Sequence, residues 1–524
     1  MVVAKEHAAG ALADLKVALA ALGLELNPTK TVVWSPNGPA GLAEVLLPNY
    51  VPSLPVLGKH LSGPGDQEEA PLQLGGDGAE LATATRRLET LWRQLSRLQK
   101  AGLAKQAAAA LLRAYAGPAS QYALQLERAS DAEVHNYDAA LTHCWETLAN
   151  RTFSEEAKTR LGLPAQQTGC GAQLAATRRN AAYWATWTKC LEDVRVDTDY
   201  TTVADLLDAT PVLTAKLTAT REGLAEQGLR LGEGAQLADA LRQTYSQKLL
   251  VGRVQKQLYA GLLATLQPDR SAEQRGGGGP GAIGFLLYPS EAACSLEDEV
   301  WATAVRQRLH LPRAEYAQAQ LAAATAVCHL RPASGRTCGE QLDERGFHAQ
   351  TEQSGGGVLE RHTRLEKAVG GLVARWLGTT PLYEQRVLAW DRPSRRSGEA
   401  GQTERAVLDL EYTDVDGRRW IDVTVRHPAA GDTSAVRAAA RRDGEASRRA
   451  ERAKHERYPG PRLVAFAVET PGRLGAEARL WLLAQVRALP QDQQAFELTR
   501  AYKVISCAVQ GATAMQLRKA AGLK

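Results

Sequence analysis

The stretch AVLDLEYTDVDGRRWIDVTV, residues 406–425, decides the fold of the C-terminal part of the chain. Its aliphatic and β-branched residues are those that pleated, half-buried strands favour, and Asp416-Gly417 is a pair typical of hairpin turns. The pattern predicts two β-strands joined by a tight turn. One carboxylate falls inside the apolar run of each strand, Asp409 in the first and Asp422 in the second.

These two aspartates have two interpretations. A carboxylate buried in a strand is costly unless something pairs it. Acidic side chains from neighbouring strands can converge on a hard divalent cation such as Mg²⁺, which takes oxygen ligands and supports phosphate chemistry. The alternative is a surface hairpin in which Asp409 and Asp422 are solvated.

The flanking residues add further elements with chemically active side chains. Glu384 falls in an expected strand, and Lys454 and Tyr458 lie four residues apart, on one face of an expected basic helix. Gly378 is the expected C-cap of the first helix. The chain predicts, in order, a helix, a strand, the hairpin, the basic helix and a last apolar strand, over residues 361–377, 382–390, 406–425, 433–458 and 462–470.

This order of elements resembles the core of the PD-(D/E)XK restriction-like nucleases. In that family paired carboxylates hold the metal, and a lysine orients the attacking water or stabilises the charge of the transition state. A closer resemblance is to the endonuclease at the C-terminal end of site-specific non-LTR retrotransposon polyproteins. The motifs of that endonuclease correspond here to Arg361-His362, Glu384, Asp409-Leu410, Asp422-Val423-Thr424-Val425 and Lys454 with Tyr458.

The resemblance implies a catalytic site with Mg²⁺ or Mn²⁺ as its cofactor. Asp409, Asp422 and Glu384 would hold the metal. Lys454 would stabilise the transition state, and Tyr458 would position Lys454 or a phosphate.

Two residues depart from the motif. Leu408 stands where the family has proline or alanine, and Thr424 replaces the usual lysine two residues after the second acid. The positive charge would then come from the basic helix, at Lys454.

Composition bounds the rest of the molecule. With 524 residues the chain is long enough for about three domains, and a net charge of +5 permits a nucleic-acid partner without requiring one. Seven scattered cysteines predict free thiols in a reducing compartment. The first residues lack the order of a signal peptide, and no apolar run reaches the roughly 18 residues that span a bilayer. We therefore expect an intracellular protein with no membrane partner, nuclear if the resemblance holds.

The first part of the chain predicts a helix over residues 5–22, a strand over 32–34 and a short strand with a turn over 56–58. Any α/β domain can contain this order. Residues 23–31 are also similar to the reverse-transcriptase palm segment that follows the catalytic aspartates, and Leu57-Gly58 is similar to the primer-grip hairpin. Because those aspartates would precede the first residue, we expect no copying of nucleic acid by this chain.

Residues 80–122 predict Ala- and Leu-rich helices with basic residues on their other faces. In the retroelement family this region is the thumb, which grips phosphates of template and primer. The alternative is an ordinary helical bundle with a solvated cationic face. The resemblance implies target DNA and element RNA as partners. The basic residues expected to contact them are Lys30, Arg93, Arg97, Lys105, Arg113 and Arg361.

Residues 141–329 predict a helical linker region, with a flexible break at the glycines 276–279. Residues 313–329 are its last expected helix. Trp184 and Trp187 lie one helical turn apart and could stack on bases, but we expect them to pack in the core.

A degenerate Cys/His knuckle follows the linker region. Relatives have three cysteines and a histidine that bind zinc. Here only Cys338 and His348 remain, because Gly335 and Glu352 occupy the other cysteine positions. Two ligands do not make a stable structural zinc site, so we expect a metal-free knuckle held by packing. Weak binding stays open, because Cys328 or His329 could fold back and Glu352 can ligate through oxygen.

Together these features predict an α+β multidomain protein. The expected function is metal-dependent DNA nicking in target-primed reverse transcription, by a fragment of a retrotransposon reverse transcriptase that lacks the polymerase aspartates. The alternatives are a protein that only binds nucleic acid and a decayed, inactive copy of the element. The expected domains are a truncated palm remnant, a helical thumb, a helical linker region, the knuckle and a small mixed α/β restriction-endonuclease-like domain, over residues 1–65, 66–140, 141–329, 330–362 and 363–524.

Overall fold

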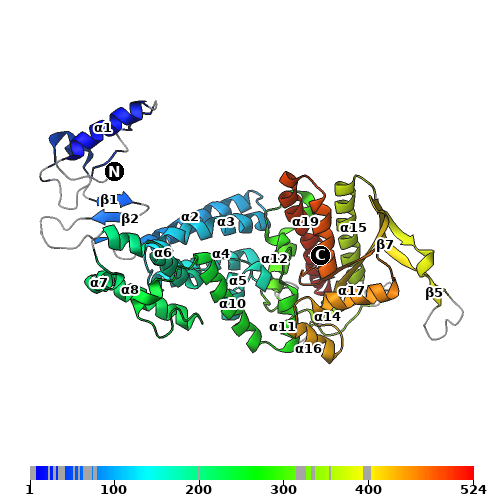
Figure 1. Ribbon diagram of the computed structural model, residues 1–524. Coiled ribbons are helices and arrows are strands. Elements are labelled where there is room, and N and C mark those ends of the chain that lie inside the picture. The colour runs from blue at the N-terminus through cyan, green and yellow to red at the C-terminus, as the bar shows by residue number, and fades with distance from the viewer. Residues whose placement is uncertain are drawn as a thin grey trace.

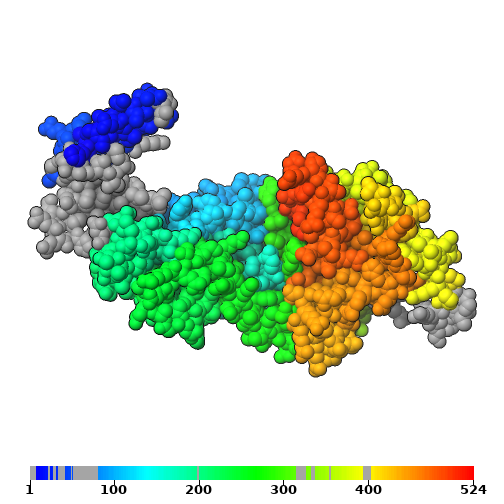
Figure 2. Space-filling model, in the orientation of Figure 1, coloured from blue at the N-terminus to red at the C-terminus, as the bar shows by residue number. Residues whose placement is uncertain are grey.

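The computed structural model is mostly helical, with one four-stranded mixed sheet near the C-terminal end, and belongs to the expected α+β class (Figure 1). Figure 2 shows the C-terminal domain, yellow to red, seated against the green linker region. The structure describes residues 7–21, 24–27, 31–33, 40, 42–50, 53–56, 59–62, 73–74, 79–197, 200–313, 315, 326–331, 335, 337–352, 356–393 and 403–523.

The described α-helices account for most of the chain. They are α1 (Ala8–Ala21), α2 (Ala79–Lys100), α3 (Lys105–Leu126), α4 (Asp131–Ala149), α5 (Glu155–Gly162), α6 (Ala175–Asp197), α7 (Val203–Ala209), α8 (Pro211–Glu226), α9 (Leu237–Leu241), α10 (Gln247–Thr265), α11 (Pro268–Gly276), α12 (Asp298–Arg308), α14 (Phe347–Thr351), α15 (Gly357–Leu377), α16 (Thr433–Arg441), α17 (Glu445–Arg457), α18 (Ala476–Arg487) and α19 (Gln491–Ala520).

Three sheets are present in the described residues. The N-terminal one has β1 (Ser53–Val56), β2 (Lys59–Ser62) and β3 (Gln73–Leu74) in that order. The largest has β4 (Leu382–Arg386), β7 (Val407–Asp414), β8 (Gly417–Arg426) and β9 (Leu463–Glu469), and the third pairs β5 (Arg392–Pro393) with β6 (Thr403–Glu404).

The N-terminal segment contains the expected helix, α1, none of whose residues is buried. Strands β1 and β2 form an antiparallel hairpin in which Val56 faces Lys59. The expected turn residues Leu57 and Gly58 lie outside the described residues. Val33, from the expected strand at 32–34, forms only an isolated parallel bridge with Tyr50.

One hydrophobic core joins the expected thumb to the linker region. Leu88 of α2 and Leu112 of α3 are buried in the same cluster as Trp145 of α4 and Trp301 of α12, and the two indole rings stack at 6.4 Å. The expected boundary at residue 140 falls inside α4, because both ends of that helix bury side chains in this core. The expected boundary at residue 362 likewise falls inside α15. Of the expected helix 313–329, the structure describes residues 313, 315 and 326–329.

A second core lies under α6, α7, α8 and α10 and contains the fully buried Trp184. Trp187 lies at its edge, with its ring 6.1 Å from that of Tyr183. The expectation that these tryptophans pack in the core is therefore confirmed.

The prediction of a flexible break at residues 276–279 is wrong. All four glycines are buried. The backbone N–H of Gly279 donates to Gln166 O at 3.3 Å, and the carbonyl of Gly276 accepts from the Arg473 N–H at 2.9 Å. Glycines occur here because residues 166–168, 428 and 469–473 approach the backbone more closely than a side chain would allow.

The C-terminal sheet has the strand order β4-β7-β8-β9, with β9 parallel to β8 and the other neighbours antiparallel. The expected hairpin is confirmed, and Gly417 at its turn has a φ of 109°, which glycine adopts readily. Buried and less buried residues alternate along β7, as in a strand with one face on the core. In Figure 1, α15 and α19 stand side by side over this sheet.

The connection from β8 to β9 contains two helices where the sequence predicted one. Helix α16 ends at Arg441 and α17 begins at Glu445, with Gly444 between them at a φ of 70°. Arg442 caps the end of α16, and Gly444 is the N-cap of α17, which packs against β8 and β9. The turn matters because α17 carries Lys454.

Candidate active site

Asp409 and Asp422 meet where the ladder between β7 and β8 ends. The last paired residues are Leu410 and Ile421, so one further step places the two aspartates opposite each other. Beyond this point Asp409 Oδ2 accepts a hydrogen bond of 2.5 Å from the backbone N–H of Val423. The Asp409 carboxylate thus accepts from a backbone N–H that would otherwise donate to a carbonyl of β7. The two carboxyl groups also share a hydrogen bond.

Lys454 approaches this pair from α17. Its Nζ lies 2.6 Å from Asp422 Oδ2. The Lys454 side chain is 26 % exposed and that of Asp422 is 4 % exposed. The ammonium group therefore lies on the solvent side of the buried acid, where a substrate can reach it.

Helix α15 contributes two groups to the same place. His362 Nε2 lies 3.1 Å from Asp409 Oδ1. Glu366 follows one helical turn later on the same face, is buried, and its Oε1 has no hydrogen-bond partner among the described residues. The sequence analysis placed His362 in a motif but gave it no role and missed Glu366. Their spacing of four residues on a helix that precedes the acidic strands was the available signal.

Glu384 lies in β4, across from Asp409. Its neighbours Tyr383 and Gln385 pair with Leu410 and Leu408 of β7. Glu384 itself has a φ of 51°, a left-handed conformation that is costly for a non-glycine residue. Its side chain is exposed. Burial raises the pKa of Glu366, and the charges of Asp409 and Glu384 add to this effect. The structure thus places Glu384 at the rim of the cluster.

Tyr458 caps the C-terminal end of α17 next to an aromatic group. Its ring lies 5.6 Å from that of Trp390, which in turn lies 5.3 Å from Trp420. The Arg457 guanidinium covers the Tyr458 ring at 4.8 Å. Burial and the nearby Asp422 carboxylate raise the pKa of Tyr458. Its hydroxyl is therefore protonated and able to donate at neutral pH.

The two aspartates differ in protonation. Burial raises the pKa of Asp422 to about 7, an effect that Lys454 opposes and Asp409 reinforces. Burial also acts on Asp409, but hydrogen bonds from His362 and the Val423 amide outweigh it, so the pKa of Asp409 lies below its usual value. The hydrogen bond to Asp409 raises the pKa of His362. Asp409 therefore carries the negative charge, and Asp422 carries the proton in part at neutral pH.

The residues expected to contact nucleic acid separate into two groups. Arg93 and Arg97 are exposed on α2, whereas Lys30 lies outside the described residues. The other three have internal partners in this structure, and their contact with nucleic acid stays a prediction. Lys105 Nζ lies 3.0 Å from a Glu299 carboxylate oxygen. Arg113 donates to Leu286 O.

Arg361 is the most enclosed of these residues. It is 2 % exposed and donates to Gln350 O and Gln516 Oε1. Burial lowers its pKa to about 10. In the Arg361-His362 motif, Arg361 therefore makes buried contacts within the domain, and His362 contacts the acid pair.

The knuckle brings together Cys338, His348 and the two further groups that the sequence left open as ligands, Cys328 and Glu352. Cys338 and His348 lie together as expected, with Cys338 Sγ 3.5 Å from His348 Nε2. Cys328 and Glu352 join them. Cys328, ten positions before Cys338 in the sequence, thus takes the place of the motif cysteine that is Gly335 here.

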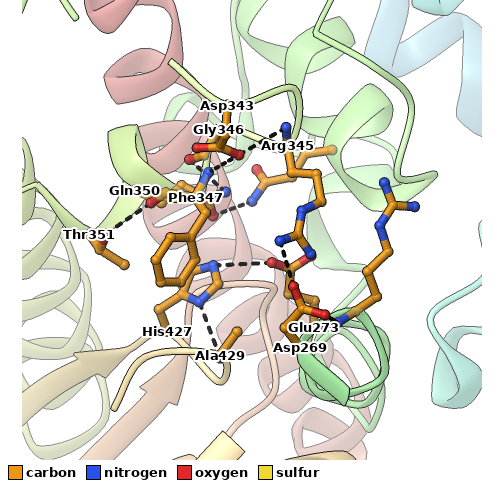
Figure 3. A network of polar contacts seen from close by, with 12 residues as sticks. Asp269, Glu273, Asp343, Arg345, Gly346, Phe347, Gln350, Thr351, His427 and Ala429 are labelled. Atoms are coloured by element: carbon orange, nitrogen blue, oxygen red, sulfur yellow. Dashed lines mark hydrogen bonds and ion pairs between the residues drawn. The ribbon is translucent and has the colours of Figure 1, made fainter. Parts of the chain in front are cut away.

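A second polar cluster lies at the junction of α11, the knuckle and the loop after β8 (Figure 3). His427 Nε2 lies 3.8 Å from Glu273 Oε1, and Arg345 pairs with Asp269 at 2.5 Å. Burial raises the pKa of Glu273 to about 7 and lowers that of His427 to about 3. The cluster borders a cavity of about 30 Å³, room for about two water molecules. His427 and Glu273 are therefore largely enclosed, whereas Arg345 and Asp269 are partly exposed.

Neither a scan against protein-family models nor a search of curated proteins finds a match for this chain. All seven cysteines are free thiols in the structure. Among the described residues, none of the helices combines the length and apolar character that a bilayer crossing needs.

Proposed function

We propose that the C-terminal domain hydrolyses phosphodiester bonds in DNA with the aid of a divalent metal ion. The observation that supports this most strongly is the meeting of Asp409, Asp422 and Lys454 at the open end of the β7–β8 ladder. Two carboxylates can hold a cation, and an adjacent ammonium group can face a phosphate. DNA as the substrate, and nicking in target-primed reverse transcription, rest on the resemblance to retrotransposon endonucleases.

The side chains fit a hard divalent cation. Asp422 is hard to ionise while Asp409 is charged beside it, and Glu366 Oε1 is a buried oxygen without a hydrogen-bond partner among the described residues. A cation would relieve both conditions by supplying positive charge to oxygen ligands. When bound, Mg²⁺ or Mn²⁺ would neutralise phosphate charge and favour ionisation of a water molecule. Glu384 at the rim is the remaining acid of the set.

The protein groups have separable roles in this proposal. Lys454 stabilises negative charge that develops on the phosphate. His362 holds the Asp409 carboxylate in orientation through its Nε2 contact. Tyr458, with its raised pKa, donates a hydrogen bond to a phosphate oxygen or positions Lys454.

The test is nicking of supercoiled DNA in Mg²⁺ by the full chain and two matched variants. Asp422→Asn removes one acid at nearly constant volume, and we expect the rate to fall by about 10²–10³-fold or more. Asp416→Asn is the control, because Asp416 lies in the turn of the same hairpin with a side chain that is 71 % exposed. Far-UV circular dichroism should be the same for all three. Undiminished nicking by Asp422→Asn with an intact fold rejects the proposed site.

A second candidate function, binding nucleic acid without cutting it, is favoured by a basic stripe on α2. Arg86, Arg93, Arg97 and Lys100 are exposed and recur at intervals of seven, four and three residues, which places them on one helix face. This function predicts affinity that falls steeply with salt. Replacing Arg93 and Arg97 together with alanine should reduce the salt slope by about two. Asp422→Asn should leave the affinity unchanged, in contrast to its effect on nicking.

A further inference from the structure

A short hairpin in the knuckle brings two distant cysteines together. Residues 326–331 run antiparallel to residues 337–342, with the Cys338 N–H donating to Leu330 O at 2.8 Å and the Cys328 N–H donating to Glu340 O at 2.8 Å. This pairing places Cys328 and Cys338 side by side although ten residues separate them in sequence. The Cys328 side chain is fully buried.

Helix α14 supplies the other two groups. Asp343 accepts hydrogen bonds from the backbone N–H groups of Phe347 and His348 and thereby fixes the start of this helix. Glu352 follows His348 by four residues, with its N–H on the His348 carbonyl at 2.8 Å. The imidazole and the carboxylate therefore leave one helix face and point at the hairpin.

The distances among Cys338, His348 and Glu352 are those of a tetrahedral metal site, and Cys328 lies near two of them. Cys338 Sγ lies 3.5 Å from His348 Nε2 and 3.4 Å from Glu352 Oε2, and the latter two atoms are 3.7 Å apart. Cys328, Cys338 and His348 offer ligand atoms within 4.8 Å of one another. With metal–sulfur bonds of about 2.3 Å and metal–nitrogen or metal–oxygen bonds of about 2.0 Å, tetrahedral zinc gives ligand-to-ligand distances of about 3.3–3.8 Å.

The histidine also has the outer partner that zinc ligands usually have. His348 Nε2 lies 3.5 Å from Cys338 Sγ and 3.7 Å from Glu352 Oε2, whereas Nδ1 lies 3.3 Å from Glu340 Oε2. A carboxylate at the second ring nitrogen fixes the tautomer and increases the basicity of the ligating nitrogen. Cys338, His348 and Glu352 therefore have the spacing of metal ligands together with an outer partner, and Cys328 is close enough to be the fourth ligand.

We infer that Cys328, Cys338, His348 and Glu352 bind one structural zinc ion. This set differs from the Cys-Cys-His-Cys spacing of the resembling family at two of its four positions, which is why motif counting predicted no stable site. The surrounding core is small and includes Leu517 and Ala520 of α19, and the His329 N–H donates to the Ala520 carbonyl at 2.9 Å. Zinc would therefore fix the end of α19 to the knuckle. The inference is independent of the proposed nuclease activity.

The test measures metal content and spectra of the purified full chain, with no activity assay. We expect about one zinc per chain after dialysis. Replacement of zinc by Co²⁺ should give thiolate-to-cobalt charge-transfer absorption whose intensity reflects two thiolates. Cys328→Ser should reduce this intensity by about half and weaken zinc binding by at least about 100-fold, whereas Cys190→Ser, at a half-buried thiol on α6, should change neither.

Two further variants keep the test decisive if Cys328→Ser fails to fold. Glu352→Cys should raise the charge-transfer intensity by about half and tighten zinc binding, because thiolate is the preferred ligand in structural sites. Glu340→Gln should weaken binding by about 10–100-fold. A chain that holds no stoichiometric zinc and gives no thiolate-to-cobalt absorption overturns the inference. Unchanged absorption in Cys328→Ser overturns the assignment of that ligand.

Discussion

The acid pair at the end of the β7–β8 ladder and the polar cluster around Glu273 each contain a carboxyl group whose pKa rises to about 7, in both cases first through burial. Their surroundings differ. Asp422 contacts a partly exposed ammonium group at 2.6 Å, with Asp409 opposite it on the neighbouring strand. Glu273 instead faces the neutral His427 at 3.8 Å, while Asp269 and Arg345 near it pair with each other. A perturbed acid alone therefore does not mark a functional site. Direct contact between the perturbed acid and a partly exposed cation distinguishes the first cluster from the second.

The largest expected effect comes from Lys454, which only the first cluster possesses. Lys454→Ala should lower the nicking rate by about 10²–10³-fold, because the developing phosphate charge loses its ammonium partner. Lys454→Arg should restore part of the rate. Arg452→Ala, on the same helix with a 64 % exposed side chain, is the matched control. Equal rates for Lys454→Ala and Arg452→Ala would remove the distinction between the two clusters.

The next effect concerns stability and belongs to Glu273. Its pKa rises from 4.5 to about 7 on folding, so the folded state binds the proton more tightly and stability falls as pH rises through that window. Glu273→Gln abolishes this loss. The variant should gain up to about 3 kcal/mol in unfolding free energy relative to the parent between pH 4.5 and 8.

Chemical denaturation at several pH values measures this difference. Glu233→Gln, at a carboxylate whose side chain is 69 % exposed, is the control and should follow the parent. A parent chain whose unfolding free energy is flat across this range contradicts the buried, protonated state of Glu273.

A smaller effect distinguishes the two clusters through the pH dependence of the nicking rate. Because Asp422 must lose its proton to hold a cation, nicking should rise about tenfold per pH unit below about 7 and level off above it. Higher Mg²⁺ should move the midpoint to lower pH, since metal and proton compete for the same carboxylate. Glu273→Gln should leave the midpoint in place. A shifted pH midpoint in this variant would show that protonation of one cluster affects the other.

The smallest effect is spectroscopic and compares the two histidines. His362 donates to the charged Asp409, so its ring should titrate above the ordinary value of 6.5. His427 accepts from the Ala429 N–H through Nδ1 and is fully enclosed, so it should stay neutral from about pH 5 to 8. NMR of selectively labelled histidine measures both. A protonated His427 at pH 6 would contradict this enclosure.

Local patterns predicted the elements that carry the acid pair. Alternation along β7, the Asp-Gly turn and the Gly378 cap, whose φ is 64°, all match the structure. These features depend on neighbours one to four residues away, which a sequence displays directly. Local spacing likewise predicted that Lys454 lies on a helix, which the structure places in the connection from β8 to β9.

Sequence patterns did not reveal contacts between residues that are distant in the chain. Lys105 was expected on a phosphate-binding face, but Glu299 lies beside it. The glycines 276–279 were expected to be flexible, but Gln166 and Arg473 enclose them. The sequence left open whether Cys328 folds back onto the knuckle, and only the hairpin register placed it next to Cys338.

The sequence alone determined the α+β class, the hairpin, and which acids and lysine stand on neighbouring elements, because strand alternation, turn chemistry and helical spacing are local properties of the chain. Only the tertiary structure decided that Asp409 and Asp422 come together with Lys454, His362 and Glu366. It also decided that Glu273 is mostly buried. Distances between side chains and their desolvation depend on how the elements pack, and that information is spread over contacts between residues far apart in the chain.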